Sequence, residues 1–235
     1  MGHVENYVEN PVENRVPTCG ETNLTKDCEK TVAINTKTPP RWSLANRGKN
    51  FEKILEYANR YYKNSGTAII AKQYVEMLPI RNGKGQIVTC KIGEKSTVDY
   101  LGRYGGYPIA IEAKESNQGS IRFDAVQDHQ ARFLEAYSQP GIAIGLVLVS
   151  FDTERFFAVP AVFWLPARKA WAEAQRKGKR TAEKITIAEY GQTWTTPGKA
   201  SVRPEELLPE WEVFPTPNCT LHYLKGAERY IGTPK

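Results

Sequence analysis

Apolar and polar residues alternate with a helical period in the first well-patterned stretch of the chain, after Asn46. Phe51, Leu55, Ala58 and Tyr62 recur at intervals of three or four, which predicts one apolar helix face. Gly66 stands where such a helix would end. The run 67–72 (TAIIAK) that follows is short, apolar and rich in β-forming residues, so we expect a strand there.

Two hairpins are predicted next. The first spans 78–90 (LPIRNGKGQIVTC), where Asn82-Gly83 between two β-prone runs is a strong short-range turn signal. Its basic residues make it a positively charged β-ribbon, or stalk, over about 76–92. The second hairpin has arms at 97–100 and 107–114, joined through a glycine-rich stretch.

The remaining pattern predicts a single α/β domain. Helices are expected at 124–137 and 162–177, a strand buried on both faces at 141–150, and a shorter strand at 156–159. The predicted fold is a mixed sheet flanked by helices over 41–235. Proline-rich, irregular chain is expected in a C-terminal extension, about 178–235, and residues 1–40 are expected to form a disordered acidic tail.

Charge favours a polyanionic partner. The chain of 235 residues has a formal net charge of +6 and a pI of about 9.0. The first 40 residues hold six acids and four bases, so the body is close to +8. A basic body attracts nucleic acid, although many basic proteins bind none.

Other function classes lack support in the sequence. No apolar run is long enough to span a bilayer, and the polar N-terminus does not resemble a signal peptide, so we expect a cytoplasmic protein. Four scattered cysteines and three histidines offer no zinc-ligand spacing, and reduced thiols are the favoured interpretation. A disulfide between Cys19 and Cys28 stays open.

The candidate chemistry lies on the second hairpin. Side chains alternate along a strand, so Glu112 and Lys114 share a face, and antiparallel pairing brings Asp99 beside Glu112. Two carboxylates suit Mg²⁺, and a lysine can orient water and stabilise charge on phosphorus. This spacing fits the PD-(D/E)xK nuclease pattern, with Val98 where proline is usual. The alternative is a weak Glu112–Lys114 ion pair on a solvated sheet face.

Two further polar residues extend the candidate site. Glu52 lies on the polar face of the first helix, where it could add a carboxylate. Gln130 lies on an otherwise apolar helix face and needs a polar partner, which a metal–water cluster would supply. A simple hydrogen bond from Gln130 to the helix backbone is the alternative.

Several segments, in the same order, resemble the RecU-type Holliday junction resolvases. They are Asn46-Arg47-Gly48, Phe51-Glu52-Lys53, 96–100 (STVDY), 111–115 (IEAKE), His129-Gln130 and 221–224 (LHYL), and together they span roughly 46–230. In two respects the chain departs from the family: the stalk interval is somewhat shorter, and Val98 stands where a second threonine is typical.

The resemblance implies a homodimer that binds four-way DNA junctions and nicks two opposed strands symmetrically with Mg²⁺, for which Mn²⁺ substitutes. It implies that Asp99, Glu112 and the Ala113 carbonyl bind the metal and that Lys114 is the catalytic lysine. It also implies supporting roles for Thr97 and Gln130 and an outer carboxylate at Glu52. Recombination or branch-migration proteins are expected partners, at the nucleoid.

Basic residues gather on the predicted site-bearing elements. As a group they favour a DNA cradle that positions phosphates, although each alone could be a solvated charge. They are Arg47, Lys49, Lys53, Arg60, Lys72, Arg81, Lys84, Lys91, Lys95 and Arg103. Tyr100 and Tyr104 could stack on opened bases, although core or surface packing is the favoured role for both.

Three functions therefore compete. The first is a Holliday junction resolvase. The second is another PD-(D/E)xK endonuclease that cuts duplex or flap DNA, such as a repair or restriction enzyme. The third is a non-catalytic DNA-binding accessory protein of recombination, against which the intact Asp99, Glu112 and Lys114 argue.

Overall fold

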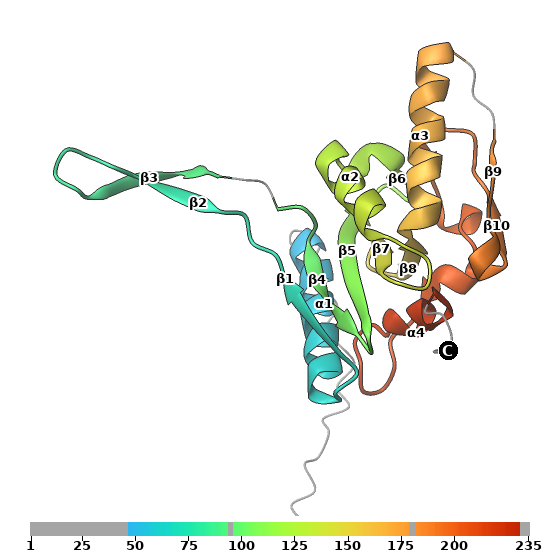
Figure 1. Cartoon of the computed structure of the whole chain (residues 1–235), viewed down its shortest axis with the longest axis horizontal. Coiled ribbons are helices and arrows are strands. Elements are labelled where there is room, and N and C mark those ends of the chain that lie inside the picture. Colours follow the sequence, from blue (N-terminus) through green and yellow to red (C-terminus); the bar gives the residue numbers. More distant parts are fainter. Residues whose placement is uncertain (1–46, 94–95, 179–181, 231–235) are drawn as a thin grey trace, which may run out of the picture. The chain divides into compact units, whose positions relative to one another are not determined.

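The computed structural model describes the backbone of residues 47–93, 96–178 and 182–230 (Figure 1). The predicted tail, 1–40, lies outside the described residues. No helix in these ranges is both long and apolar enough to cross a membrane.

A six-stranded mixed sheet organises the described chain. Its order is β1 (Ala68–Lys72), β4 (Tyr100–Tyr104), β5 (Tyr107–Ser116), β7 (Ile144–Phe151), β8 (Arg155–Pro160) and β12 (Glu212–Val213). Only β5 and β7 run parallel, and every other neighbouring pair is antiparallel. The mixed sheet is therefore confirmed, as are the strands predicted at 67–72, 107–114, 141–150 and 156–159, to within a few residues. The hairpin arm predicted at 97–100 is wrong, because 97–99 lie outside any strand and β4 continues through Gly102, where it pairs with β1.

Helices cover both faces of this sheet. Helix α1 (Arg47–Asn64) packs its predicted apolar stripe on one face, and α2 (Asp128–Tyr137) and α3 (Ala161–Lys177) pack on the other (Figure 1). Strand β7 is buried along its whole length and alternates between the two cores: Leu146 faces the α1 side and Val147 the α2–α3 side. A strand that is covered on both faces has a nearly continuous apolar sequence, as predicted.

The start of α2 differs from the sequence prediction. Helix was expected from Asp124, but Phe123–Ala125 form a 3-10 turn, Val126 is extended, and α2 begins at Asp128. The cause is a capping box, in which the Gln130 side chain accepts a hydrogen bond from Gln127 N at 2.9 Å. Val126 is buried, as the apolar pattern required, but from an extended backbone.

A separate antiparallel ribbon forms the predicted first hairpin. Strands β2 (Met77–Arg81) and β3 (Ile87–Ile92) pair only with each other and lie away from the six-stranded sheet in Figure 1. The turn is longer than a two-residue Asn-Gly loop. Asn82 Oδ1 accepts bonds from Lys84 N and Gln86 N, and Gly85, not Gly83, takes the left-handed conformation at φ +77°.

The expectation of irregular chain after Gly178 is wrong for the described part. It forms the hairpin β9 (Lys184–Ile187) and β10 (Gln192–Thr195), and β11 (Ser201–Val202), which pairs with β6 (Ile121–Arg122). Strand β12 and the short helix α4 (Leu224–Ala227) follow. Trp194 and Trp211 enter the α2–α3 core, and the hydroxyl of Tyr223 donates to Asn59 on α1. This segment completes both cores.

Replacement of Trp211 by alanine should therefore destabilise the protein by about 3–5 kcal/mol, because a large buried side chain leaves a cavity. Trp211 is 0% exposed and its ring contacts Phe163 and Trp194. The control is Phe214→Ala, three residues later and 62% exposed, with an expected effect within about 0.5 kcal/mol. Urea denaturation measures both, and equal midpoints for the two variants would contradict an integral C-terminal segment.

Candidate active site

Asp99 and Glu112 meet where β4 begins. The register pairs Tyr100 with Ile111, so the next antiparallel step sets Asp99 opposite Glu112. Asp99 Oδ2 accepts a hydrogen bond from Ala113 N at 2.8 Å, which fixes the carboxylate against β5. The predicted convergence of these two acids is therefore present in the fold.

Glu112 is enclosed completely. Its side chain is 0% exposed, and its Oε1 lies 2.5 Å from Nζ of Lys114, the neighbour on the same strand face. The alternative of an ion pair on a solvated face does not hold for Glu112. The pKa of Glu112 is raised to about 7, mainly by burial and also by the nearby charge of Asp99, while Lys114 acts in the opposite direction.

This donor set suits a divalent cation. Two carboxylates, one of them desolvated, repel each other, and an added positive charge would relieve both effects. Within the described ranges no three His, Cys, Asp or Glu side chains form a ready-made metal cluster. Mg²⁺ does not require one, because it uses one or two protein carboxylates together with water and phosphate oxygens. The residues therefore fit Mg²⁺ better than a metal that needs a complete protein cage.

A cavity of about 210 Å³ opens beside Asp99. It gathers side chains from α1, β1, the start of β4 and β5: Phe51, Glu52, Lys72, Asp99, Tyr100, Ala113 and Glu115. The sequence therefore named three polar residues that the fold brings together here, Glu52, Lys72 and Asp99. The cavity is large enough for several water molecules beside a phosphate group.

Lys72 is already engaged at this cavity. Its Nζ lies 2.8 Å from Oε2 of Glu52 and 3.6 Å from Oε1 of Glu56, both on α1. The hydrogen bond that Lys72 donates to Glu52 is the main reason that the pKa of Lys72 is raised. A DNA phosphate would have to share this cation with two carboxylates.

Glu115 was missed by the sequence analysis. It lies two residues beyond Ala113 on β5 and lines the same cavity as Asp99. Strand alternation could have found it, because residues two apart share a face. The sequence motif ends at Lys114, and Glu115 lies on the opposite face of the strand from Lys114.

The immediate environments of Gln130 and Thr97 do not test the supporting roles predicted for them. Gln130 is buried, and its side-chain oxygen caps α2 at Gln127 N, which is the hydrogen bond to the helix backbone left open above. Thr97 is exposed just before the buried Val98. Their supporting roles at a metal stay predictions.

The predicted DNA-binding residues are spread over three regions. Arg47 and Lys49 fall in α1, but their side chains lie outside the described set, as does Lys95. Lys53 and Arg103 are exposed on α1 and β4, and Lys84 is exposed at the ribbon turn. Arg81 is also exposed, with its Nη1 donating to Gly85 O at 2.8 Å, so it braces the turn.

The two tyrosines proposed for base stacking are placed differently from that idea. Tyr100 is 2% exposed in the α1-side core, which confirms packing, the favoured role for it, and excludes stacking on a base. Tyr104 is partly buried and its hydroxyl donates to Oε1 of Glu228 at 3.0 Å.

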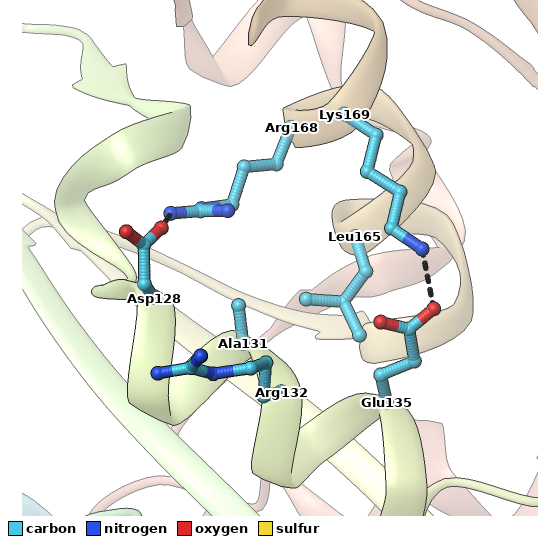
Figure 2. A pocket seen from close by; sticks show the side chains of 7 residues that line it. All are labelled: Asp128, Ala131, Arg132, Glu135, Leu165, Arg168 and Lys169. Atoms are coloured by element: carbon cyan, nitrogen blue, oxygen red, sulfur yellow. Dashed lines mark hydrogen bonds and ion pairs between the residues drawn. The ribbon is translucent and has the colours of Figure 1, made fainter.

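A second charged cavity of about 190 Å³ lies between α2 and α3 (Figure 2). Four of its charged residues are paired across the two helices, Arg168 with Asp128 and Lys169 with Glu135, and Arg132 also lines it. None of the predicted catalytic residues lines it. It is a helix–helix contact zone, and the site beside Asp99 remains the candidate for chemistry.

The raised pKa of Glu112 gives a pH signature in metal-free protein. Between the ordinary carboxyl value of 4.5 and about 7, the folded state binds more protons than the unfolded state, so stability falls as pH rises through this range. Thermal unfolding in EDTA measures this effect. Between pH 5 and pH 8 the free energy of unfolding of wild type should fall by more than that of Glu112→Gln, with a difference of at most about 3 kcal/mol. The exposed Glu154→Gln should follow wild type, and parallel curves for all three proteins would contradict this origin.

Comparisons with known proteins point to one family. The family model described as Recombination protein U, RecU, matches residues 46–208. A protein from Lactobacillus delbrueckii subsp. bulgaricus is 32% identical over 149 residues, which cover 60% of this chain and 70% of that protein. One from Streptococcus thermophilus is 34% identical over 140 residues (56% and 70%), and one from Streptococcus sanguinis is 32% identical over 167 residues (68% and 80%). All three are named Holliday junction resolvase RecU. Because the family model spans well over half of the chain, the protein belongs to the RecU family.

Proposed function

We propose that this protein is a Mg²⁺-dependent endonuclease that resolves four-way DNA junctions in recombination and repair, built on a restriction-endonuclease-like PD-(D/E)xK fold. The observation that carries the proposal is the meeting of Asp99 with the buried Glu112, which is ion-paired to Lys114, in a chain of the RecU family. A plain DNA-binding module would gain nothing from a buried carboxylate with a raised pKa.

Asp99 and Glu112 would hold the metal, with Ala113 alongside. When bound, Mg²⁺ would neutralise charge on a phosphate oxygen and acidify a water molecule. Glu112 must be ionised to serve as a ligand, so its elevated pKa favours activity above neutral pH. Mn²⁺ would substitute because it accepts the same oxygen donors.

Lys114 contributes a fixed positive charge. Its Nζ is held 2.5 Å from Glu112 on an enclosed strand, so the ammonium group is oriented before substrate arrives. We propose that it orients the attacking water and stabilises the negative charge that develops on phosphorus. Glu52 would adjust the site from outside through its ion pair with Lys72.

DNA would approach over α1 and β4. Lys53 and Arg103 are exposed cations on these elements, and Arg47 and Lys49 belong to the same helix. Such contacts fix the position of the phosphate backbone without reading sequence. Their summed charge also brings a polyanion to a cavity whose own acids would repel it.

The ribbon would be the stalk of a dimer. Among the described residues, seven of the eleven exposed large hydrophobic side chains fall between Tyr74 and Ile92. A bare two-stranded ribbon is marginally stable in water, and a concentrated apolar surface indicates a binding partner. We propose that a second copy of the chain and the centre of the junction cover it. Nucleoid location and contact with recombination or branch-migration proteins would follow from this role.

The chemical proposal is tested by cleavage of labelled four-way, flap and duplex DNA with Mg²⁺. Asp99→Asn should lower the cleavage rate by at least about 100-fold, because loss of a ligand costs more than loss of an outer partner. Asp128→Asn is the control, since Asp128 is an exposed acid of the α2–α3 cavity. Symmetric nicks confined to the junction support resolution, and equal cutting of duplex supports a general nuclease. Junction binding without cutting under Mg²⁺ or Mn²⁺ would leave the accessory-protein alternative.

The dimer proposal is tested by light scattering after gel filtration. Wild type should give twice the chain mass of 26.5 kDa. Met77→Lys with Ile92→Lys, which places charges on a directly paired position of the ribbon, should shift the protein toward monomer. Ile142→Lys adds a charge at an exposed aliphatic residue outside the ribbon and should leave the mass unchanged. A monomeric wild type would count against paired nicking.

A further inference from the structure

Tyr74 is unusually open for an aromatic residue. It lies in the link 73–76 between β1 and β2 and is 81% exposed, the highest value among the exposed large hydrophobic residues of the described chain. Core packing therefore does not explain it. Single exposed hydrophobic residues are common on protein surfaces, so the position of Tyr74 has to carry the argument.

Tyr74 follows directly in the chain on residues that contact the candidate active site. Gln73 N donates a hydrogen bond to Asp99 O at 2.7 Å, which ties the link beside Tyr74 to the backbone of the proposed metal ligand. Lys72, two residues before Tyr74, lines the cavity that Asp99 also lines.

A solvated aromatic ring in such a place matches the chemistry of a nucleobase. Bases stack on aromatic side chains with little regard to sequence, because every base has a π-face. At a strand crossover or a site of cutting, the base next to the target phosphate can leave its own stack at a modest cost. A ring beside the phosphate site can hold that nucleotide and so hold the phosphate in line with the reacting groups.

We propose that Tyr74 stacks on the nucleobase adjacent to the phosphate that is cut, and that it positions this nucleotide for Asp99 and Glu112. This inference rests on the proposed nuclease function and adds a contact that the sequence motifs did not indicate. Stacking requires the aromatic ring and not the hydroxyl group. Tyr74→Phe should therefore keep the function and Tyr74→Ala should lose it.

Tyr57 is the matched control. It is also an exposed tyrosine, 51% exposed, on α1, but the guanidinium of Arg60 lies 5.6 Å from its ring centroid and covers it. Tyr57→Ala should cut and bind the junction like wild type.

The test compares intact four-way junctions with junctions in which the base on one or the other side of the cut is removed, leaving the sugar and phosphate. Cleavage is measured with Mg²⁺, and binding is measured with Ca²⁺ in its place. On the intact junction, Tyr74→Ala should lose about 10-fold to 100-fold in one or both measurements. On one of the two base-free junctions, wild type and Tyr74→Ala should become equal, because there is no base to stack.

Two results would overturn the inference. The first is an equal loss by Tyr74→Ala on intact and base-free junctions, which would mean that the ring acts on the protein and not on a base. The second is wild-type behaviour of Tyr74→Ala on every substrate. If wild type itself cuts no DNA, the proposed nuclease function fails, and the binding comparison still decides whether Tyr74 contacts a base. Thermal unfolding of Tyr74→Ala should match wild type, since the side chain is exposed.

Discussion

Burial of β5 on both faces is the constraint on which the rest of the molecule depends. This strand pairs with β4 on one side and β7 on the other, and each of its faces is covered by a different core. Ile109 and Ile111 support α1, while Ala110 supports the α2–α3 side. Glu112 then continues the face of Ala110 into an enclosed environment where a carboxylate is costly to ionise. The same packing that holds the strand in place therefore makes ionisation of Glu112 unfavourable.

Charged groups close to Glu112 offset part of this cost of ionisation. Lys114 supplies a charge on the same face, and the Ala113 amide between them holds Asp99 at the rim of the cavity. Lys72 and Glu52 form a second pair across the same opening, from a strand and a helix that differ from those of the first pair. The arrangement separates enclosed charges, which can act on a reaction, from more accessible charges, which can rearrange when a substrate arrives.

Much of this could be predicted from the sequence where the pattern is strong and local. The helix stripe from Phe51 to Tyr62 and the strand alternation around Glu112 each follow one simple period. The failures arise where tertiary contacts decide. Trp211 and Tyr223 are isolated aromatic residues in proline-rich chain without any period, so nothing local shows that they close the cores. Whether Tyr100 packs in the core or on the surface could not be decided, because the depth of the core over β4 does not follow from the sequence of β4.

The other edge of the sheet has a consequence for how the protein behaves at high concentration. Strand β12 is only two residues long, pairs with β8, and is followed by Phe214, Pro215 and Pro217. Prolines donate no backbone hydrogen bond, so a further strand would find few partners along this border. The C-terminal segment thereby ends the sheet on that side. Besides completing the fold, it disfavours edge-to-edge pairing between copies of the chain, and so aggregation.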